Sequence, residues 1–533
     1  MARTGANAPL STPTPATDHP ALATPNVAAE PDLAASRVSH MEARTRFAPS
    51  PTGIQHIGGF RTALFSWLLT RHYGGQFIIR IEDTDTARTV EGAVDAVLEG
   101  FRWLGLDWDE GPDVGGPYGP YYQTQRRAIY LEYTEQLIAS GHAYRCFCTP
   151  ERLETVRMMQ RQRGEPPRYD RHCRHLTSDE VAARVSAGEP YTVRLAVPYE
   201  GTTRVQDALR GVIVFENSTL DDRVLLKSDG LPTYHLAHLI DDHLMRITHV
   251  FRAEEWIPSA PLHVLIYEAF GWQPPIFVHV PDVLEGSGGK KLSKRHGAKS
   301  MQDLRAEGFL PEAVLNYMAL LGWSYDDKTD VLSLDQIMKA FSIERVGVAG
   351  ARYDEGRLLW FNGYYIRQLT PEALTERTLP FLERPQAEGG LPESVARPLD
   401  REYTARVLRL EQERMKTLAE APGMTEFFFT DAIEYPASLL IAKQMDATRT
   451  LDGLRRSEKL LSDLTSWEAT AMEQPMRDLA AELNQKPGQL FTSVRVAVTG
   501  RTVSPPLFET MEVLGREVSL RRLREAIANL EAE

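Results

Sequence analysis

The chain has 533 residues, a formal net charge of −13 and only three cysteines. This length allows several domains with buried cores, and a hydrophobic content of 42% with 25% charged residues is ordinary for a globular protein. The acidic balance excludes indiscriminate nucleic-acid binding, although a local basic surface is compatible with it. Three cysteines exclude a disulfide framework, and no apolar run is long enough to span a membrane.

The N-terminal segment, residues 1–42, is rich in Ala, Pro and Thr and has no periodic apolar face. Such a composition buries too little apolar surface to fold, so we expect a disordered extension. A transit peptide is the weaker interpretation, because such peptides avoid the acidic residues present here, and Met41 is a candidate for the true start. With no secretory signal, we expect the protein in the cytoplasm.

Regular structure is expected from Arg44 on. A strand over 44–48 is followed by a helix that ends at Gly74-Gly75, a strand over 77–81 and a helix over 94–104. Apolar residues recur at helical spacing in both helices, and the second strand is almost continuously apolar, as in a buried parallel sheet. Strand, helix, strand, helix within about sixty residues is typical of a doubly wound α/β domain.

The pattern changes twice further along the chain. Strand-like pieces such as 191–197 indicate an α+β insertion, and helical spacing of Leu, Ala, Glu and Arg beyond about residue 300 predicts an all-α C-terminal region. We therefore expect a multidomain chain with a Rossmann-like α/β catalytic domain. Its parts are a disordered extension (1–42), a first catalytic half (43–126), the insertion (127–230), a second catalytic half (231–297) and two helical domains (298–370 and 371–533).

The segment Arg46-Phe-Ala-Pro-Ser-Pro-Thr-Gly-Ile-Gln-His-Ile-Gly-Gly59 joins the first strand to the first helix. Its prolines fix the backbone that leaves the strand, and Gly58 and Gly59 let a ligand approach the start of the helix. A helix N-terminus offers unpaired N–H groups and about half a positive charge, which favours phosphate, and His56 can donate to a phosphate oxygen. The alternative is a structural turn with a histidine that caps the helix.

A basic loop occurs much later, in Glu285-Gly-Ser-Gly-Gly-Lys-Lys-Leu-Ser-Lys-Arg295. Alone, this sequence is more typical of a solvated loop. Together with the proline-rich turn, it predicts the second half of a split phosphate-binding site. A mobile basic loop can close over a triphosphate and stabilise the charge that develops at phosphorus.

These two segments, with Arg80-Ile-Glu-Asp-Thr-Asp85 between them, resemble class I aminoacyl-tRNA synthetases, and within that class the bacterial glutamyl-tRNA synthetases. The likeness runs from about Arg44 to the C-terminus, through GLPTYHLAHLIDDHL, THVFRAEEW, LLWFNGYYIR and VTGRTVSPPLFETMEVLG. It implies ATP-dependent ligation of L-glutamate to tRNA(Glu) through glutamyl-adenylate, with Mg²⁺, for protein synthesis. It also implies a monomer without membrane contacts.

The resemblance assigns site residues. It places the catalytic role on the phosphate-binding side chains His56, Lys291 and Lys294. The ATP site it implies comprises Pro49, Ser50, Gly53, His56, Gly58, Gly59, Lys291, Leu292, Ser293, Lys294 and Arg295. The glutamate site it implies comprises Arg46, Ala48, Ser50, Glu82, Tyr234, His238 and Arg252.

Charge explains the glutamate assignment. A guanidinium group matches a carboxylate, and Glu82 would face the ammonium group of the amino acid. An arginine dedicated to the side-chain carboxylate would also reject glutamine, whereas an isolated arginine is more often part of a surface ion pair. Trp256 is either a pocket wall or a core residue. Two positions depart from the family pattern: Gly59 replaces the last histidine of the HIGH-type motif, as in many glutamyl enzymes, and His238 stands where an asparagine is usual.

All three cysteines lie in one window, as Cys146-Phe-Cys148 and Cys173-Arg-His175. Three thiolates and one imidazole make a closed tetrahedral site for structural Zn²⁺, whereas ordinary buried cysteines beside a surface histidine are the alternative. Similar sites occur in some bacterial glutamyl enzymes, where a tyrosine can be the fourth ligand. Tyr169 is therefore a second candidate for that position.

The segment 151–174 between the cysteines is basic, and we expect the zinc site to shape an insertion that binds the acceptor end of tRNA. Its arginines are Arg152, Arg157, Arg161, Arg163, Arg168, Arg171 and Arg174. In the helical C-terminal third, the resemblance implies contacts with the tRNA stem and anticodon, Arg414 among the latter. The cluster Tyr364-Tyr365-Ile-Arg367 fits nucleic-acid contact or core packing.

Other functions remain open alternatives. A shorter relative transfers glutamate to a modified tRNA base, but it matches only the catalytic half. A glutaminyl-tRNA synthetase has a C-terminal part rich in β-barrels, unlike the helical pattern here. A non-catalytic tRNA-binding paralogue should have lost His56 or the lysines, and a plain nucleotidyltransferase does not need this length.

Overall fold

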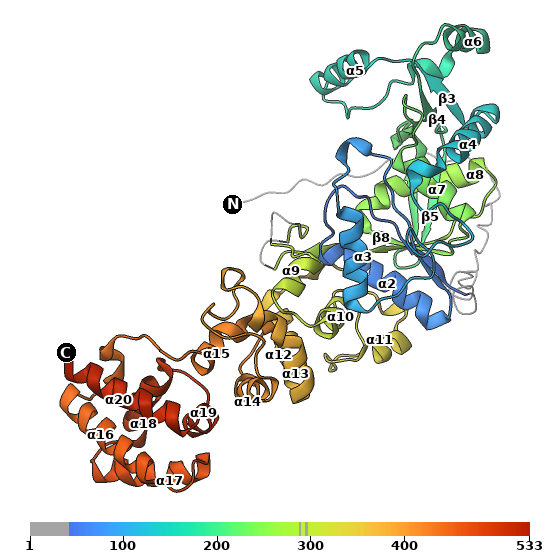
Figure 1. Ribbon diagram of the computed structural model, residues 1–533. Coiled ribbons are helices and arrows are strands. Elements are labelled where there is room, and N and C mark those ends of the chain that lie inside the picture. The colour runs from blue at the N-terminus through green and yellow to red at the C-terminus, as the bar shows by residue number, and fades with distance from the viewer. Residues whose placement is uncertain (1–41, 287–288, 294–296, 533) are drawn as a thin grey trace, which may run out of the picture. The chain divides into compact units, whose positions relative to one another are not determined.

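The structure is a computed structural model, and it describes residues 42–286, 289–293 and 297–532. The expected disordered extension lies outside these residues, apart from Glu42. The described chain begins with β1 (Arg44–Phe47), α2 (Ile57–Tyr73), β2 (Gln76–Ile79) and α3 (Ala93–Leu104), as Figure 1 shows. This order confirms the prediction, and β1 and β2 pair in parallel. Gly74 ends α2 in the left-handed conformation, with φ 69°, where glycine carries no Cβ penalty.

The parallel arrangement continues on the other side of β1. The strands β8 (His249–Ala253) and β9 (Ile276–Val280) pair in parallel, and the N–H of Thr248 donates to the carbonyl of Arg44 at 2.9 Å, beside β1. The helices α7 (Tyr234–Leu244) and α8 (Ala260–Ala269) flank this second half. The fold is the expected Rossmann-like one. In such sheets ligands bind beyond the carboxyl ends of the strands.

Part of the segment expected as an insertion joins this sheet. The strand β5 (Thr202–Asp207) pairs antiparallel with β6 (Gly211–Glu216) and parallel with β9, which gives the order β6-β5-β9-β8. A separate antiparallel sheet consists of β3 (Ala143–Cys146), β4 (Thr192–Leu195) and β7 (Val224–Leu226). One continuous core includes residues of both sheets, so the limits of the insertion remain a prediction.

Three shorter helical elements follow the catalytic sheet: α9 (Met301–Ala306), α10 (Pro311–Ala319) and α11 (Leu334–Ala340). From 353 to 532, a stretch that is described throughout, no residue lies in a strand. Its α-helices are α12 (Glu355–Arg367), α13 (Pro371–Glu383), α14 (Arg401–Glu411), α15 (Ala421–Phe429), α16 (Ala447–Asp463), α17 (Ala469–Glu482), α18 (Pro487–Thr499), α19 (Leu507–Leu514) and α20 (Arg516–Ala532). The predicted all-α C-terminal region is confirmed over this stretch. The two-residue strand β11 (Ala351–Arg352), which pairs with β10 (Val283–Leu284), lies just before it, in the range that was expected to be helical.

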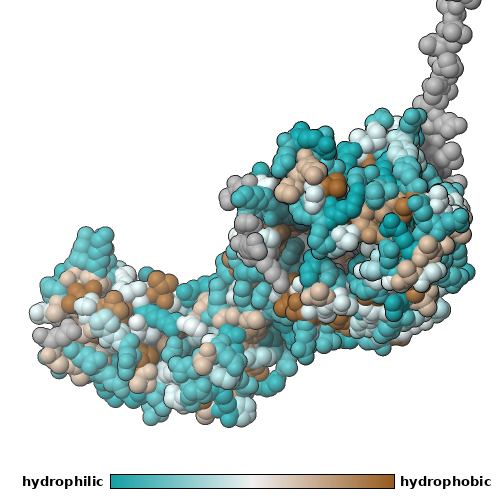
Figure 2. Space-filling model, turned by 90° about the horizontal axis from the view of Figure 1, so that it is seen from above, coloured by the Kyte–Doolittle hydropathy of each residue, from teal (hydrophilic) through white to brown (hydrophobic). Residues whose placement is uncertain are grey.

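Within the described ranges, no helix is both long enough and apolar enough to cross a lipid bilayer. The face seen in Figure 2 carries mostly hydrophilic residues, with hydrophobic ones scattered in small groups.

Candidate active site

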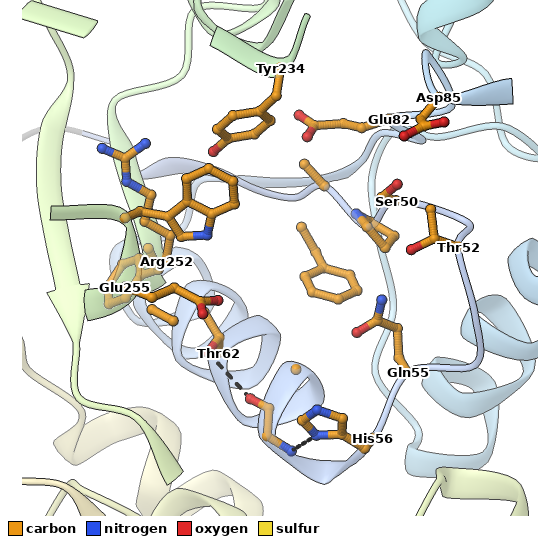
Figure 3. Close-up of a pocket in the computed structure, with 18 of the residues that line it drawn as sticks. Ser50, Thr52, Gln55, His56, Thr62, Glu82, Asp85, Tyr234, Arg252 and Glu255 are labelled. Atoms are coloured by element: carbon orange, nitrogen blue, oxygen red, sulfur yellow. Dashed lines mark hydrogen bonds between the residues drawn. The ribbon is translucent and has the colours of Figure 1, made fainter. Parts of the chain in front are cut away.

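A cavity of about 740 Å³ lies beyond the carboxyl ends of β1, β2, β8 and β9. Its lining contains most of the residues expected at the ATP and glutamate sites, and Trp256 is also part of the wall. These expected residues are Arg46, Ala48, Pro49, Ser50, His56, Gly58, Gly59, Glu82, Tyr234, Arg252, Lys291 and Leu292. Figure 3 shows Tyr234 and Glu82 toward one end of the cavity and His56 at the other. Segments distant in the sequence thus meet at one ligand-sized site.

Gly53 and Ser293, which were expected at the site, are not part of this lining. Gly53 lies in the turn after β1, and Ser293 follows Leu292 on the basic loop. Lys294 and Arg295 lie outside the described residues.

His238 does not line the cavity either. Its ring stacks on the ring of Tyr234, with centroids 4.2 Å apart, and its Nδ1 lies 2.5 Å from the Tyr234 carbonyl oxygen. The side chain is buried one layer behind the wall, because it stands one helical turn after Tyr234. The geometry therefore does not support direct contact between His238 and glutamate. His238 would affect glutamate binding only by positioning the ring of Tyr234.

His56 caps α2. The N–H of Gly58 donates to His56 Nδ1 at 3.1 Å, so the capping interpretation applies to this residue. An imidazole that accepts at Nδ1 carries its proton on Nε2, so the cap also defines which nitrogen can donate to a phosphate. A Cβ on Gly58 would lie 3.0 Å from His56 Cε1, which explains the glycine at this position. The cap and a phosphate contact are thus compatible.

Lys291 lies at the cavity with two acidic neighbours. Its Nζ is 2.5 Å from Glu255 and 3.1 Å from Asp282. The N–H of Leu292 donates to the carbonyl of Val283 at 2.7 Å. This backbone hydrogen bond holds the segment that contains Lys291 against the strand β10 (Val283–Leu284). Phosphate groups in the cavity would compete with the two carboxylates for this ammonium group.

Arg252 is 5% exposed and has two imidazole partners. Its Nε donates to His279 Nε2 at 2.9 Å, and its Nη1 lies 3.0 Å from His263 Nδ1. Its Nη2 is buried and has no hydrogen-bond partner among the described residues. A buried donor without a partner costs about 1–3 kcal/mol, so an incoming carboxylate oxygen would complete this group.

Glu82 is a nearly buried carboxylate on the cavity wall. Burial raises its pKa to about 7, although the nearby guanidinium groups of Arg80 and Arg46 act in the opposite direction. Arg80 Nη2 lies 3.0 Å from Glu82 Oε1. Near neutral pH this group therefore exists in both protonation states, and only the ionised one attracts an ammonium group.

Behind the wall lies a buried ionic network that the sequence reasoning missed. Asp242 accepts from Arg46 at 3.0 Å and from Arg80 at 2.8 Å, and Asp241 accepts from Arg126 at 2.7 Å. Burial would raise the pKa of Asp242, but Arg46 and Arg80 outweigh it and lower the pKa to about 2. Two signals in the sequence could have revealed the network. Arg80 lies within the apolar run 77–81, and Asp241 and Asp242 are adjacent carboxylates in a helix of otherwise mostly apolar and histidine residues.

The three cysteine sulfurs lie within 4.8 Å of one another, and Cys146 and Cys173 are buried. The Tyr169 hydroxyl is 3.2 Å from the Cys146 sulfur and 3.4 Å from the Cys148 sulfur. The three sulfurs are compatible with a zinc site, and the Tyr169 oxygen lies beside them. The cluster lies at the end of β3, beside the antiparallel sheet of the insertion.

His175 does not join the sulfurs. Its Nε2 lies 3.2 Å from the hydroxyl of Tyr199 instead. Cys173 and His175 share a 3₁₀ turn (His172–His175), and residues two apart in such a turn point to different sides. The geometry therefore does not support the prediction that His175 is the fourth ligand. The geometry favours the alternative, Tyr169.

The basic stretch divides into two groups. Arg171 and Arg174 both pair with buried Asp222 at 3.2 Å, Arg152 pairs with Asp170 at 2.6 Å, and Arg168 donates to the Ser218 carbonyl. These arginines hold the insertion together. The other three, whose ion pairs within the described part of the chain are with exposed carboxylates, are Arg157, Arg161 and Arg163.

In the C-terminal third, the Tyr365 hydroxyl donates to Asn316 Oδ1 at 3.0 Å, which favours core packing for this residue. Arg414 pairs with the buried Glu411 at 2.7 Å, and its side chain is 39% exposed. An anticodon contact by Arg414 stays a prediction.

The fold and the site define a class I aminoacyl-tRNA synthetase. Residues 42–360 match the family model "tRNA synthetases class I (E and Q), catalytic domain", and 373–527 match "Anticodon binding domain". The chain is 47% identical over 489 residues to a glutamate–tRNA ligase of Dehalococcoides mccartyi (strain CBDB1), which covers 92% of this chain and 98% of the relative. It is 48% identical over 494 residues to the Roseiflexus castenholzii (strain DSM 13941 / HLO8) glutamate–tRNA ligase, over 92% and 97% of the two chains.

A solved structure gives the same picture. A glutamate tRNA ligase from Elizabethkingia meningosepticum CCUG26117, in complex with its amino acid, superposes with a TM-score of 0.82 at 36% identity, over 92% of this chain and all of that one. The chain belongs to the glutamate–tRNA ligase family.

Proposed function

We propose that the cavity binds ATP and L-glutamate side by side, and that the chain attaches glutamate to tRNA(Glu) through glutamyl-adenylate in translation. The observation that carries this proposal is the convergence of His56, Lys291 and Arg252 on one cavity. The first two would bind phosphate oxygens, and the third a carboxylate. No covalent intermediate with the enzyme is required, so positioning and charge stabilisation supply the catalysis.

At the phosphate end, the N-terminus of α2 and His56 Nε2 would donate to ATP oxygens while Lys291 exchanges its carboxylate partners for phosphate. Lys294 and Arg295, which lie outside the described residues, are proposed to add charge from the same loop. Mg²⁺ bound with ATP would neutralise further phosphate charge. The glutamate α-carboxylate attacks the α-phosphorus in line, an oxygen–phosphorus bond forms, and pyrophosphate leaves.

At the amino-acid end, two arginines differ in their balance of charge. Arg46 is paired with the Asp242 carboxylate, whereas among the described residues Arg252 has two histidines as hydrogen-bond partners and the Tyr234 hydroxyl nearby. Burial lowers the pKa of His263 well below its usual value, and also that of His279, so both are neutral near pH 7. Arg252 thus keeps a net positive charge. We assign it to the side-chain carboxylate, where it favours glutamate over neutral glutamine.

We expect glutamate binding to weaken as the pH falls. Glu82 must be ionised to attract the substrate ammonium group, and its pKa is about 7. The KM for glutamate should therefore rise about tenfold for each pH unit below that value and be flat above it. Steady-state aminoacylation between pH 6 and 8.5 measures this. In Glu82→Gln the KM should be high at every pH, and a pH dependence that survives in this variant would assign the titration to another group.

The reaction is tested by incubating the enzyme with bulk bacterial tRNA, ATP, Mg²⁺ and radiolabelled glutamate, with glutamine in parallel. Stable label from glutamate alone supports the proposal, and sequencing of the charged tRNAs identifies the acceptors. Label from glutamine would contradict the proposal and indicate the activity of a glutaminyl-tRNA synthetase. No label from folded protein would favour a non-catalytic paralogue.

Two alternatives are weakened. The relative that glutamylates a modified tRNA base matches only the catalytic half, whereas this chain also matches an anticodon-binding family over 373–527. The β-barrel-rich C-terminal part of glutaminyl enzymes has no counterpart in 353–532, a fully described stretch without strands.

We propose that Cys146, Cys148, Cys173 and Tyr169 hold Zn²⁺, which would cross-link the insertion. Cys173→Ser and Tyr169→Phe are expected to lower bound zinc from about one ion per chain, whereas His175→Ala should retain it, because His175 points to Tyr199. Metal analysis after dialysis against a weak chelator measures this. Loss of zinc in His175→Ala and its retention in Tyr169→Phe would reverse the ligand assignment.

The exposed arginines of α5 (Pro150–Gln162) are proposed to contact the tRNA acceptor end, since this helix has no buried residue. Removing two phosphate contacts in Arg157→Ala/Arg161→Ala should weaken tRNA binding and reduce the slope of log affinity against log salt by about 1.5. Filter binding across a salt series measures the slope. Arg184→Ala, on the helix that follows, is the matched control. An equal change in the control would contradict a special role of α5.

The link between zinc and tRNA binding has its own test. If removal of zinc leaves the tRNA affinity unchanged, the zinc site does not shape the tRNA-binding surface.

We further propose, from the family resemblance, that the enzyme acts as a monomer in the cytoplasm. A dimer mass in analytical ultracentrifugation at working concentration would contradict the first part.

A further inference from the structure

We propose that Asp207 and His279 are positioning residues for Arg252, and that this pair sets both the KM for glutamate and the preference for glutamate over glutamine. The inference rests on the proposed function of Arg252 as the partner of the side-chain carboxylate. Neither residue lines the cavity. Both act through Arg252, from the strands β9 and β5 of the sheet that contains Arg252 on β8.

The Asp207 carboxylate is held from several sides. It is the last residue of β5, and its Oδ1 accepts from the N–H groups of Leu209 and Arg210, both at 2.9 Å. Its Oδ2 accepts from the N–H of His279 at 3.0 Å and lies 2.6 Å from His279 Nδ1. Asp207 is 1% exposed and His279 is 0% exposed. Each oxygen therefore has assigned donors, and the carboxylate has little freedom to turn.

This contact determines the tautomer of His279. A carboxylate oxygen can only accept, so Nδ1 carries the proton and Nε2 keeps its lone pair. The guanidinium group of Arg252 can only donate, and its Nε lies 2.9 Å from that lone pair. Arg252 thus donates to His279 Nε2, and His279 Nδ1 donates to Asp207. In the other tautomer, the proton on Nε2 would point at the N–H of Arg252, so two donors would face each other.

A second imidazole completes the arrangement. His263 Nδ1 lies 3.0 Å from Arg252 Nη1, and its Nε2 lies 3.1 Å from His235 Nδ1. Two of the three guanidinium nitrogens are thus bound by neutral acceptors, and the third, Nη2, is the buried donor without a described partner. Neutral acceptors orient the group without cancelling its charge, which a carboxylate in contact would do. The arrangement leaves Arg252 Nη2, on a charged and oriented guanidinium group, available to the substrate carboxylate.

The test compares His279→Leu, His279→Gln and Asp207→Asn in steady-state aminoacylation. In Asp207→Asn the N–H groups of Leu209 and Arg210 favour the side-chain oxygen on their side, so the amide N–H₂ faces His279. There it reverses the tautomer of the ring and leaves the backbone N–H of His279 without its acceptor. We expect the KM for glutamate to rise about 10- to 100-fold in His279→Leu and Asp207→Asn, as for the loss of a hydrogen bond to a charged group. The kcat and the KM for ATP should stay within about threefold, and the use of glutamine should change less than that of glutamate.

His279→Gln should recover most of the loss, because its side-chain oxygen can accept from Arg252. The control is His249→Gln, a buried histidine on the neighbouring β8 that does not contact Arg252. An equal rise in KM in the control, or parallel losses for glutamate, glutamine and ATP, would overturn the inference, since those results indicate general damage to the sheet. Thermal melting of each variant shows that it is folded.

Arg252→Leu distinguishes the proposed role of Arg252 in glutamate binding from the positioning role of Asp207 and His279. If it leaves the KM for glutamate unchanged, the proposed role of Arg252 fails and the inference fails with it. If it raises the KM while Asp207→Asn and His279→Leu do not, only the positioning role fails. In Arg252→Leu/His279→Leu the second substitution should add no further rise in KM, and additive effects would contradict a pathway through Arg252.

Discussion

Replacing His56 by serine is expected to slow the formation of glutamyl-tRNA about 10²–10³-fold while leaving the melting temperature nearly unchanged. Serine is a good N-cap residue and can accept from the start of α2, as His56 Nδ1 accepts from Gly58 in the wild type. It is too short to place a donor where Nε2 of the imidazole would meet a phosphate oxygen. The variant therefore separates capping from catalysis. Single-turnover charging with saturating ATP, glutamate and tRNA measures the rate.

Two further variants complete this test. In Gly58→Ala the new methyl group would lie 3.0 Å from His56 Cε1, so the ring must move and the rate should fall although His56 is present. His142→Ser, which changes an exposed histidine, is the control and should charge tRNA normally. A rate loss below about fivefold in His56→Ser would mean that the histidine is only a helix cap.

Replacing Asp242 by alanine is expected to reduce the free energy of unfolding by about 3–5 kcal/mol, because Arg46 and Arg80 would remain buried without this counter-charge. The activity should fall too, since Arg46 lines the cavity. Urea unfolding followed by tryptophan fluorescence measures the stability. Glu376→Ala removes the exposed ion pair with Arg401 and should cost less than about 1 kcal/mol. A similar small loss for Asp242→Ala would show that the network contributes little.

The pH dependence of this effect has a defined sign. The pKa of Asp242 lies at about 2 in the folded protein, below its usual value of 3.8. A depressed carboxyl pKa contributes stability that is complete above the usual value and is lost as the pH falls toward the folded value. The part of the stability difference between the wild type and Asp242→Ala that comes from the Asp242 carboxyl itself should therefore be complete above about pH 4 and shrink between about pH 4 and pH 2.

Local patterns made much of the protein predictable from its sequence. The strand over 44–48, the helix ending at Gly74 and the all-α C-terminal region follow from apolar spacing and helix-ending glycines, which act over a few residues. The two segments proposed to bind phosphate were recognisable because the residue types that such a site needs occur in them at short, fixed spacing. The cysteines were informative for the same reason. Their proximity in sequence predicted the proximity of their sulfurs.

The tertiary structure decided what depends on side-chain direction and on partners far away in the chain. The turn after Cys173 carries His175 away from the sulfurs and leaves Tyr169 beside them, and the start of α7 brings Tyr234 to the cavity but leaves His238 behind it. The first outcome depends on rotation within a turn and the second on the position along a helix relative to the cavity, and the spacing in the sequence reveals neither.

The charges of the site depend on still longer distances. By itself, the sequence determined that the chain has a turn rich in proline and glycine before a helix, a basic loop, and arginines of a type suited to carboxylates. Only the folded sheet decided that Arg46 meets the carboxylate of Asp242 while Arg252 meets His279, whose tautomer is determined by Asp207 on β5. The physical reason is that a hydrogen bond joins groups adjacent in space, and the pairing of distant strands brings these groups together.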